Sequence, residues 1–164
     1  GPMLEAVSEF ASRAGEKLRK QGSFASQVYV FAHTSPFRPP PQFSRGVMVP
    51  LRRPTADSAL LVAAAIAGMR RIYEPGYQLA KCGVMLLDLV ESSLYQAELD
   101  LEPGEDRDQS HLMGTIDQLN RRFGKRTVFV GSAGVPQAHE WAMRQERRTP
   151  QYTTRLADVP IARA

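Results

Sequence analysis

Gln27-Val28-Tyr29-Val30-Phe31-Ala32-His33 is a run of β-branched and aromatic residues that predicts a strand, and the elements on either side of it decide the fold class. The segment that follows, from Thr34 to Gln42, holds four prolines and must be a loop. A second strand is predicted over residues 44–51. The two strands should therefore pair as a hairpin with a long loop.

Helices are predicted on both sides of this hairpin. Apolar residues recur at helical spacing between Leu4 and Leu18, and Gly22 follows as a stop signal. A second helix is expected over residues 56–73, with Thr55 as its N-cap and an alanine-rich interior that suits close packing on a sheet. A third strand, mostly apolar, is expected over residues 77–89. The order helix, strand, strand, helix, strand indicates an α+β fold: a split β-α-β sheet with both helices on one face, lacking one leading strand.

The charges divide the chain into three parts. Through Val90 there are 11 Lys/Arg against 6 Asp/Glu, and from Gln109 onward there are 9 against 4. Residues 91–108, the acidic linker, hold 7 acids and one arginine, and Pro103-Gly104 interrupts them. Two basic bodies joined by an acidic linker suggest surfaces that meet polyanions, although charges spread over solvated faces are the alternative.

The part after the linker is predicted to be a small α+β domain. A helix over residues 109–123 is followed by a strand over 127–130, a turn over 131–136 and a short strand or turn around Trp141. The helix carries its apolar residues on one side: Leu112, Ile116, Leu119 and Phe123. About 55 residues make a marginal core, so we expect this part to lean on the first domain or on a partner.

The sequence shows no arrangement of residues typical of a catalytic or metal-binding site. The three histidines, His33, His111 and His139, lie in different predicted elements, without the close spacing of metal ligands. The single cysteine, Cys82, excludes an internal disulfide, argues against zinc and suits a reducing cytoplasm. No apolar run approaches the roughly 18 residues of a membrane span. We therefore predict no catalytic residue, metal site or cofactor in this stretch of chain.

Basic residues on the predicted hairpin, its loops and the third strand are the candidate DNA-binding set, away from the helical face. Lysine, arginine and hydroxyl side chains on a sheet can follow a phosphate backbone without reading sequence. The alternative for any one of them is a solubilising surface charge. The set comprises Thr34, Ser35, Arg38, Arg45, Arg52, Arg53 and Lys81. Tyr29 and Phe31 alternate as in RNA-recognition sheets, but the glycine pattern of those domains is absent, which weakens that interpretation.

A short hydrophobic peptide, Gln96-Ala97-Glu98-Leu99-Asp100-Leu101, lies inside the acidic linker. Apolar side chains in a segment unable to fold alone suggest a docking peptide whose anchors, Leu99 and Leu101, fill a groove on another protein. The alternative is that the two leucines cap the core of a neighbouring domain.

Several motifs in this order resemble the UmuC family of bacterial Y-family translesion DNA polymerases, chromosomal or plasmid-borne. The motifs of the first half are Ala14-Gly15-Glu16-Lys17-Leu18-Arg19, Thr34-Ser35-Pro36-Phe37 and Lys81-Cys82-Gly83-Val84-Met85-Leu86. Those of the second half are Leu119-Asn120-Arg121-Arg122-Phe123-Gly124, Trp141-Ala142-Met143 and Pro150-Gln151-Tyr152-Thr153-Thr154-Arg155. Together they cover nearly the whole chain.

The resemblance implies a domain order and a non-catalytic role. Residues 1–3 are interpreted as a cloning scar, 4–90 as the family's little-finger domain, 91–108 as the acidic linker and 109–164 as its C-terminal extension. The little finger would hold primer-template DNA for error-prone synthesis in the SOS response. The palm carboxylates that bind catalytic magnesium are expected elsewhere in the parent polymerase.

The resemblance also implies partners. Gln96, Leu99 and Leu101 stand where the family carries its β sliding-clamp motif, in a variant without an aromatic anchor. Trp141, Tyr152 and Arg155 are candidates for contact with the UmuD′ dimer or with RecA, because aromatic and arginine residues dominate interfaces. Trp141 as the core of the small domain is the alternative. A protein-interaction adaptor with little DNA affinity is the competing function.

Overall fold

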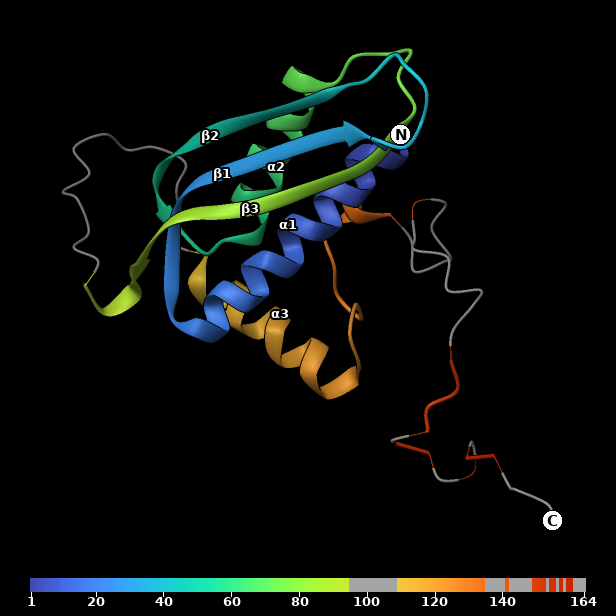
Figure 1. The fold of residues 1–164 in the computed structure, drawn as a ribbon. Coiled ribbons are helices and arrows are strands. Elements are labelled where there is room, and N and C mark those ends of the chain that lie inside the picture. The colour runs from blue at the N-terminus through green and yellow to red at the C-terminus, as the bar shows by residue number, and fades with distance from the viewer. Residues whose placement is uncertain are drawn as a thin grey trace.

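The computed structural model describes residues 1–94, 109–134 and 141, together with 149–152, 154, 155, 157, 159 and 160. Three antiparallel strands form one sheet in the order β2-β1-β3, and α1 and α2 cover the same face of it (Figure 1). The elements are α1 (Pro2–Gln21), β1 (Ser23–Thr34), β2 (Ser44–Thr55), α2 (Ser58–Ile72), β3 (Leu79–Glu91), the 3-10 turn η1 (Ser92–Leu94), α3 (Ser110–Phe123) and the 3-10 turn η2 (Gly131–Ala133). This confirms the predicted α+β class with both helices on one face.

The turn from α1 into β1 depends on a glycine. Gly22 adopts a left-handed conformation (φ 69°), and its N–H bonds the carbonyl oxygens of Leu18 and Arg19 at the end of the helix. Other residues pay a steric cost in this region, so glycine is the usual helix terminator here. The strand begins at the next residue, which places α1 directly beneath the sheet.

The central strand β1 alternates between the two faces of the sheet. Val28, Val30 and Ala32 are fully buried against the helices, whereas Tyr29 and Phe31 point to the opposite face. The helices supply most of the remaining core from their inner faces: Val7, Ala11, Leu18, Leu61, Val62, Ala65, Met69 and Ile72. The predicted run of seven residues is thus the hydrophobic and topological centre of the fold.

The second helix begins later than predicted. Asp57, not Thr55, is the N-cap: its carboxylate accepts the backbone N–H groups of Ala59 (2.7 Å) and Leu60 (3.4 Å). The Thr55 hydroxyl instead accepts the N–H of Asp57. Farther along α2, Gly68 lets the helix approach the sheet, because a Cβ there would lie 3.1 Å from Val30. The prediction of Thr55 as the cap was wrong because two cap-forming residues stand close together.

The predicted strand over residues 127–130 is absent from the structure. Asn120 on α3 bonds both backbone groups of Val128, donating to its carbonyl oxygen and accepting from its N–H, each at 2.8 Å. Arg126 has a positive φ of 67°, which turns the chain sharply just before this segment. A side chain therefore satisfies the polar groups that a neighbouring strand would have bonded.

The C-terminal part packs on α1, as the marginal core led us to expect. Arg19 on α1 forms a two-bonded ion pair with Asp117 on α3, and Glu9 lies 3.5 Å from Arg126. Trp141 meets the ring of Phe10 edge-on at 5.5 Å. Figure 1 shows α3 beside α1, on the side of the helix layer away from the sheet.

The apolar side of α3 is its exposed side. Leu112, Leu119 and Phe123 are exposed, whereas Met113 is buried in the same helix. The ion pair between Arg19 and Asp117 turns one side of the helix toward α1, and three of the four residues of the predicted apolar stripe are exposed, while the fourth, Ile116, is half-buried. Gln96, Leu99, Leu101 and His139 lie outside the described residues, and no described helix is long and apolar enough to cross a membrane.

Candidate nucleic-acid interface

The face of the sheet opposite the helices, the outer face, contains no acidic residue where Gln27 to His33 of β1 pair with β2 and β3; Glu91 of β3 pairs farther along with Ser23. Residues directly opposite one another in antiparallel strands point to the same face, so the pairings define four positions on each strand. These are Gln27, Tyr29, Phe31 and His33 on β1, Ser44, Gly46, Met48 and Pro50 on β2, and Lys81, Gly83, Met85 and Leu87 on β3. Lys81 is the permanent cation in this set, and it pairs directly with His33.

Three rings form a row along β1, the aromatic row: Tyr29, Phe31 and His33. The centroids of Tyr29 and Phe31 are 6.0 Å apart with their planes inclined by 28°. Phe31 and His33 are 6.1 Å apart and inclined by only 11°. All three side chains are half-buried, so each ring has both a supported and an accessible part.

Two glycines on the edge strands make room for these rings. A Cβ at Gly46 would lie 2.6 Å from Cζ of Tyr29, and a Cβ at Gly83 would lie 2.5 Å from Cζ of Phe31. Such distances are too short for real Cβ atoms, so both rings occupy space that glycine leaves open. The alternation of Tyr29 and Phe31 signalled part of this surface in the sequence. The glycines and His33 were missed because strand register cannot be read from one chain segment.

The predicted basic residues fall at different places around the outer face. Lys81 and Arg38 are exposed, and Arg38 in the β1–β2 loop donates to Oε1 of Gln78 at 3.1 Å. Arg52 is exposed and Arg53 half-buried, both toward the end of β2, and each makes contacts of its own. Ser35 is half-buried, and its hydroxyl accepts the N–H of Phe37 at 3.4 Å. The structure thus gathers Lys81 with the aromatic row and leaves the arginines at the periphery.

Two predicted DNA-binding residues, Thr34 and Arg45, form contacts away from the outer face. Thr34 is buried, and its hydroxyl bonds the Gln42 side chain (2.5 Å) and the backbone N–H of Phe43 (3.0 Å), so it holds the loop closed. Arg45 pairs in register with the buried Ala32, on the helix side of the sheet. There it forms an ion pair with Glu74 at 2.9 Å. The structure thus places neither side chain on the outer face of the sheet, and a role of either in DNA binding stays a prediction.

The predicted partner-binding residues are also dispersed. Trp141 packs edge-on against Phe10 of α1, which belongs to the first domain. Tyr152 is 45% exposed and Arg155 is exposed, with the backbone N–H of Arg155 bonded to the carbonyl oxygen of Gln151. Two of the three residues are therefore accessible to a partner.

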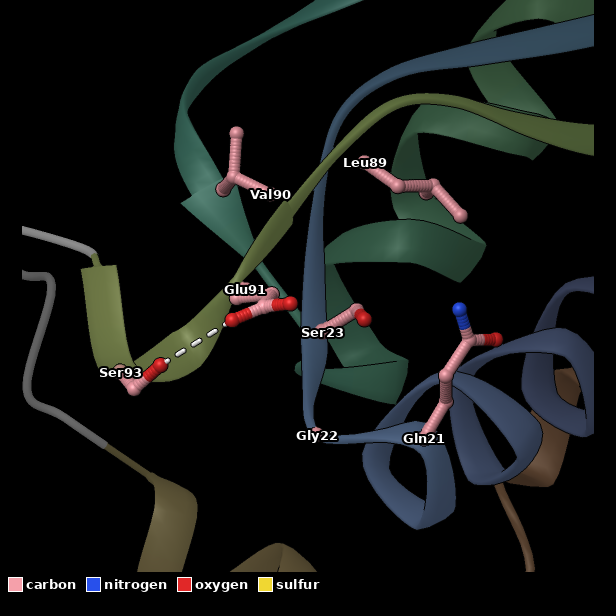
Figure 2. A pocket seen from close by; sticks show the side chains of 7 residues that line it. All are labelled: Gln21, Gly22, Ser23, Leu89, Val90, Glu91 and Ser93. Carbon is pink, nitrogen blue, oxygen red and sulfur yellow. Dashed lines mark hydrogen bonds between the residues drawn. The ribbon is translucent and has the colours of Figure 1, made fainter.

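A cleft of about 380 Å³ lies where α1 turns into β1 beside the end of β3 (Figure 2). Its lining includes Gln21, Ser23, Glu91 and Ser93, and the Ser93 hydroxyl donates to the Glu91 carboxylate at 3.4 Å. Among the described residues no cluster of His, Cys, Asp and Glu is arranged to hold a metal ion. Burial raises the pKa of the Cys82 thiol, which favours its protonated form. Glu91 is the titratable side chain among the residues that line the cleft.

Two protein-family models match the chain. Residues 2–99 match the impB/mucB/samB family C-terminal domain, and residues 110–162 match a domain of unknown function, DUF4113. Protein ImpB of Salmonella typhimurium is 36% identical over 162 residues, which cover 98% of this chain and 38% of that protein. Protein UmuC of the same species is 34% identical over 158 residues (96% and 37%), and Protein MucB of Escherichia coli is 36% identical over 163 residues (98% and 37%). The chain thus spans less than two fifths of the length of these relatives.

Proposed function

This chain belongs to the impB/mucB/samB family, and we propose that it is the DNA-holding and partner-recruiting part of an error-prone translesion DNA polymerase of the bacterial SOS response. It acts without performing the polymerase chemistry. The observation that carries the DNA-binding role is the outer face of the sheet, where Lys81 stands among uncharged and aromatic residues with no carboxylate at the twelve paired positions. A duplex carries one negative charge per about 1.7 Å of its axis, so the absence of acids at these twelve positions avoids repulsion there.

The contact is with the phosphate backbone and is independent of base sequence. Lys81 on β3 and Arg38 in the β1–β2 loop are exposed cations at different places on the domain. Lysine and arginine contacts to phosphate set position and supply affinity without discriminating bases. Through Val90 the chain has 11 basic and 6 acidic residues, and this positive net charge adds a long-range attraction to DNA.

Recruitment is assigned to the linker and the C-terminal part. Gln96, Leu99 and Leu101 form the β sliding-clamp peptide, and Tyr152 and Arg155 are candidates for the UmuD′ dimer or RecA. In this proposal the magnesium that the parent polymerase requires is bound by parts of the polymerase outside this stretch. The protein acts in the bacterial cytoplasm at the nucleoid.

One observation favours the competing function of a protein-interaction adaptor. Leu112, Leu119 and Phe123 expose an apolar stripe on α3, with Phe123 at 62% exposure. Contiguous exposed apolar side chains on a folded domain usually mark a protein-binding surface. In an adaptor, the basic faces would meet acidic partners and the DNA affinity would reside in other parts of the polymerase.

Charge reversal separates the two functions. Fluorescence anisotropy of a labelled primer-template measures DNA affinity for Lys81→Glu/Arg38→Glu across a salt series, beside Arg70→Glu on α2 as the matched control. Arg70 is also exposed but lies on α2, in the helix layer. We expect the double variant to lose at least about tenfold in affinity with a shallower salt dependence, and the control to stay within about twofold.

Partner binding is measured on the same variants by co-purification with the clamp and UmuD′, with Leu99→Ala/Leu101→Ala as the clamp-peptide control. Loss of DNA binding with partner binding intact supports the DNA-holding role. Absence of any salt-dependent DNA binding by the wild type at low ionic strength refutes it and leaves the adaptor.

A further inference from the structure

We propose that the aromatic row of Tyr29, Phe31 and His33 is a stacking surface for unpaired bases of single-stranded DNA. The inference rests on the proposed DNA-binding role and adds to it a second kind of ligand. Contacts to phosphate form equally with single-stranded and double-stranded DNA. An aromatic ring, by contrast, can stack only on a base whose face is accessible.

The spacing of the rings selects unpaired DNA. Neighbouring centroids are 6.0 and 6.1 Å apart, nearly twice the roughly 3.4 Å rise per nucleotide of a stacked strand. Bases placed on successive rings must therefore be splayed apart. A duplex cannot supply this arrangement because both faces of each base are covered by neighbouring pairs, whereas single-stranded segments present such bases to aromatic side chains.

The sheet holds the rings ready for stacking. The rings of Tyr29 and Phe31 fill the space over Gly46 and Gly83, so the neighbouring strands support them without side chains in between. The third ring is fixed by a hydrogen bond of 3.0 Å between Nδ1 of His33 and the carbonyl oxygen of Thr34. Side chains held in place before binding lose little conformational entropy when a ligand arrives.

The surroundings of the row match a nucleic-acid strand. Met48 and Met85, 58% and 47% exposed, flank Tyr29 from the two edge strands and extend the apolar surface beside it. Lys81 pairs directly with His33 and places an ammonium group at the end of the row, where it can meet a phosphate. Apolar rings with a cation at their end, and no carboxylate at the positions paired with Gln27 to His33, are the combination that single-strand-binding grooves use.

The test compares oligo(dT) with a blunt hairpin duplex, both fluorescein-labelled, at one fixed salt concentration. The variant is Tyr29→Leu/Phe31→Leu, which keeps apolar contact with the glycines but removes the flat rings. Tyr73→Leu, an exposed tyrosine at the end of α2, is the matched control. We expect the double variant to bind oligo(dT) about tenfold or more weakly and the duplex within about twofold of wild type, with the control unchanged.

A second measurement does not depend on a folded variant. Wild-type protein is irradiated with an oligonucleotide carrying 5-iodouracil, which couples to aromatic side chains stacked on it, and the adduct is located by mass spectrometry. Adducts on Tyr29 or Phe31 are expected.

Three outcomes decide between the hypotheses. Unchanged oligo(dT) affinity in the double variant with adducts elsewhere overturns the stacking surface but leaves phosphate binding through Lys81 intact. Equal loss of oligo(dT) and duplex binding by a folded variant also overturns it, because the row would then be a general DNA contact. Failure of the wild type to bind either nucleic acid refutes the proposed DNA-holding role itself.

Discussion

Replacing Asp117 by asparagine tests what fixes α3 to the rest of the molecule. Its carboxylate accepts hydrogen bonds from Nε and Nη2 of Arg19, both at 2.7 Å. The two side chains are each 15% exposed. Arg19 also donates from Nη1 to the carbonyl oxygen of Ala56 (2.7 Å) and to the hydroxyl of Ser58 (2.9 Å). One guanidinium thus connects α1, the start of α2 and α3.

The burial of this ion pair determines how much stability its loss should cost. Breaking a buried ion pair from one side costs about 3–5 kcal/mol, and an exposed pair contributes about 0–1 kcal/mol. At 15% exposure the Arg19–Asp117 pair is closer to the buried case, but asparagine keeps one acceptor, so we expect Asp117→Asn to cost about 2 kcal/mol. Arg19→Ala also removes the hydrogen bonds to Ala56 and Ser58, so it should lower the free energy of unfolding by about 3–4 kcal/mol.

The assay is urea unfolding followed by circular dichroism and by the fluorescence of the single tryptophan, Trp141, which packs on α1. Lys20→Ala is the matched control, because its ion pair with Glu16 is 59% and 42% exposed, and it should change stability by less than about 0.5 kcal/mol. An Asp117→Asn curve that overlays the wild type with both probes, or a Lys20→Ala effect as large as that of Asp117→Asn, would refute the reasoning.

Three further predictions concern single positions. Asp57→Ala should destabilise the protein by about 1 kcal/mol in urea unfolding, because two N–H groups of α2 lose their acceptor, and Asp57→Asn should restore most of it. Gly22→Ala should cost about 1–2 kcal/mol by the same measurement, since φ of 69° strains a residue with a Cβ; an unchanged midpoint contradicts the helix-end geometry. Cys82 should react with iodoacetamide far more slowly in the native protein than in urea at mildly alkaline pH, because burial raises its pKa and suppresses the thiolate; equal rates would place it at the surface.

The alternation of helices and strands was predictable because periodicity is a local property. The run from Gln27 to His33 identified β1, and the stripe from Leu4 to Leu18 identified α1. What failed depended on contacts across the fold. Residues 127–130 have strand composition, but the side chain of Asn120 forms hydrogen bonds with both backbone groups of Val128. The sequence around Val128 gives no sign of these bonds.

The candidate site was predicted in part. Lys81 and Arg38 are exposed as expected, and the sequence pattern of Tyr29 and Phe31 indicated ring alternation. Arg45 was misplaced because the loop length left the register of the hairpin open, and a shift of one position moves a side chain to the other face of the sheet. The actual pairing puts it opposite the buried Ala32.

The clamp peptide remains a prediction from sequence. Gln96 to Leu101 lies outside the described residues, so its anchoring role depends on the family resemblance and on the co-purification of the Leu99→Ala/Leu101→Ala variant.

The central claim, that the outer face of the sheet receives DNA, is tested most directly by mapping backbone amide chemical shifts of the isotope-labelled protein during titration with a primer-template. We predict that the perturbed amides gather on β1, β2 and β3 and in the loop between Thr34 and Phe43, and that the shifts diminish as salt is raised. Perturbations confined to α2 or α3, with the sheet unaffected at low salt, would contradict it.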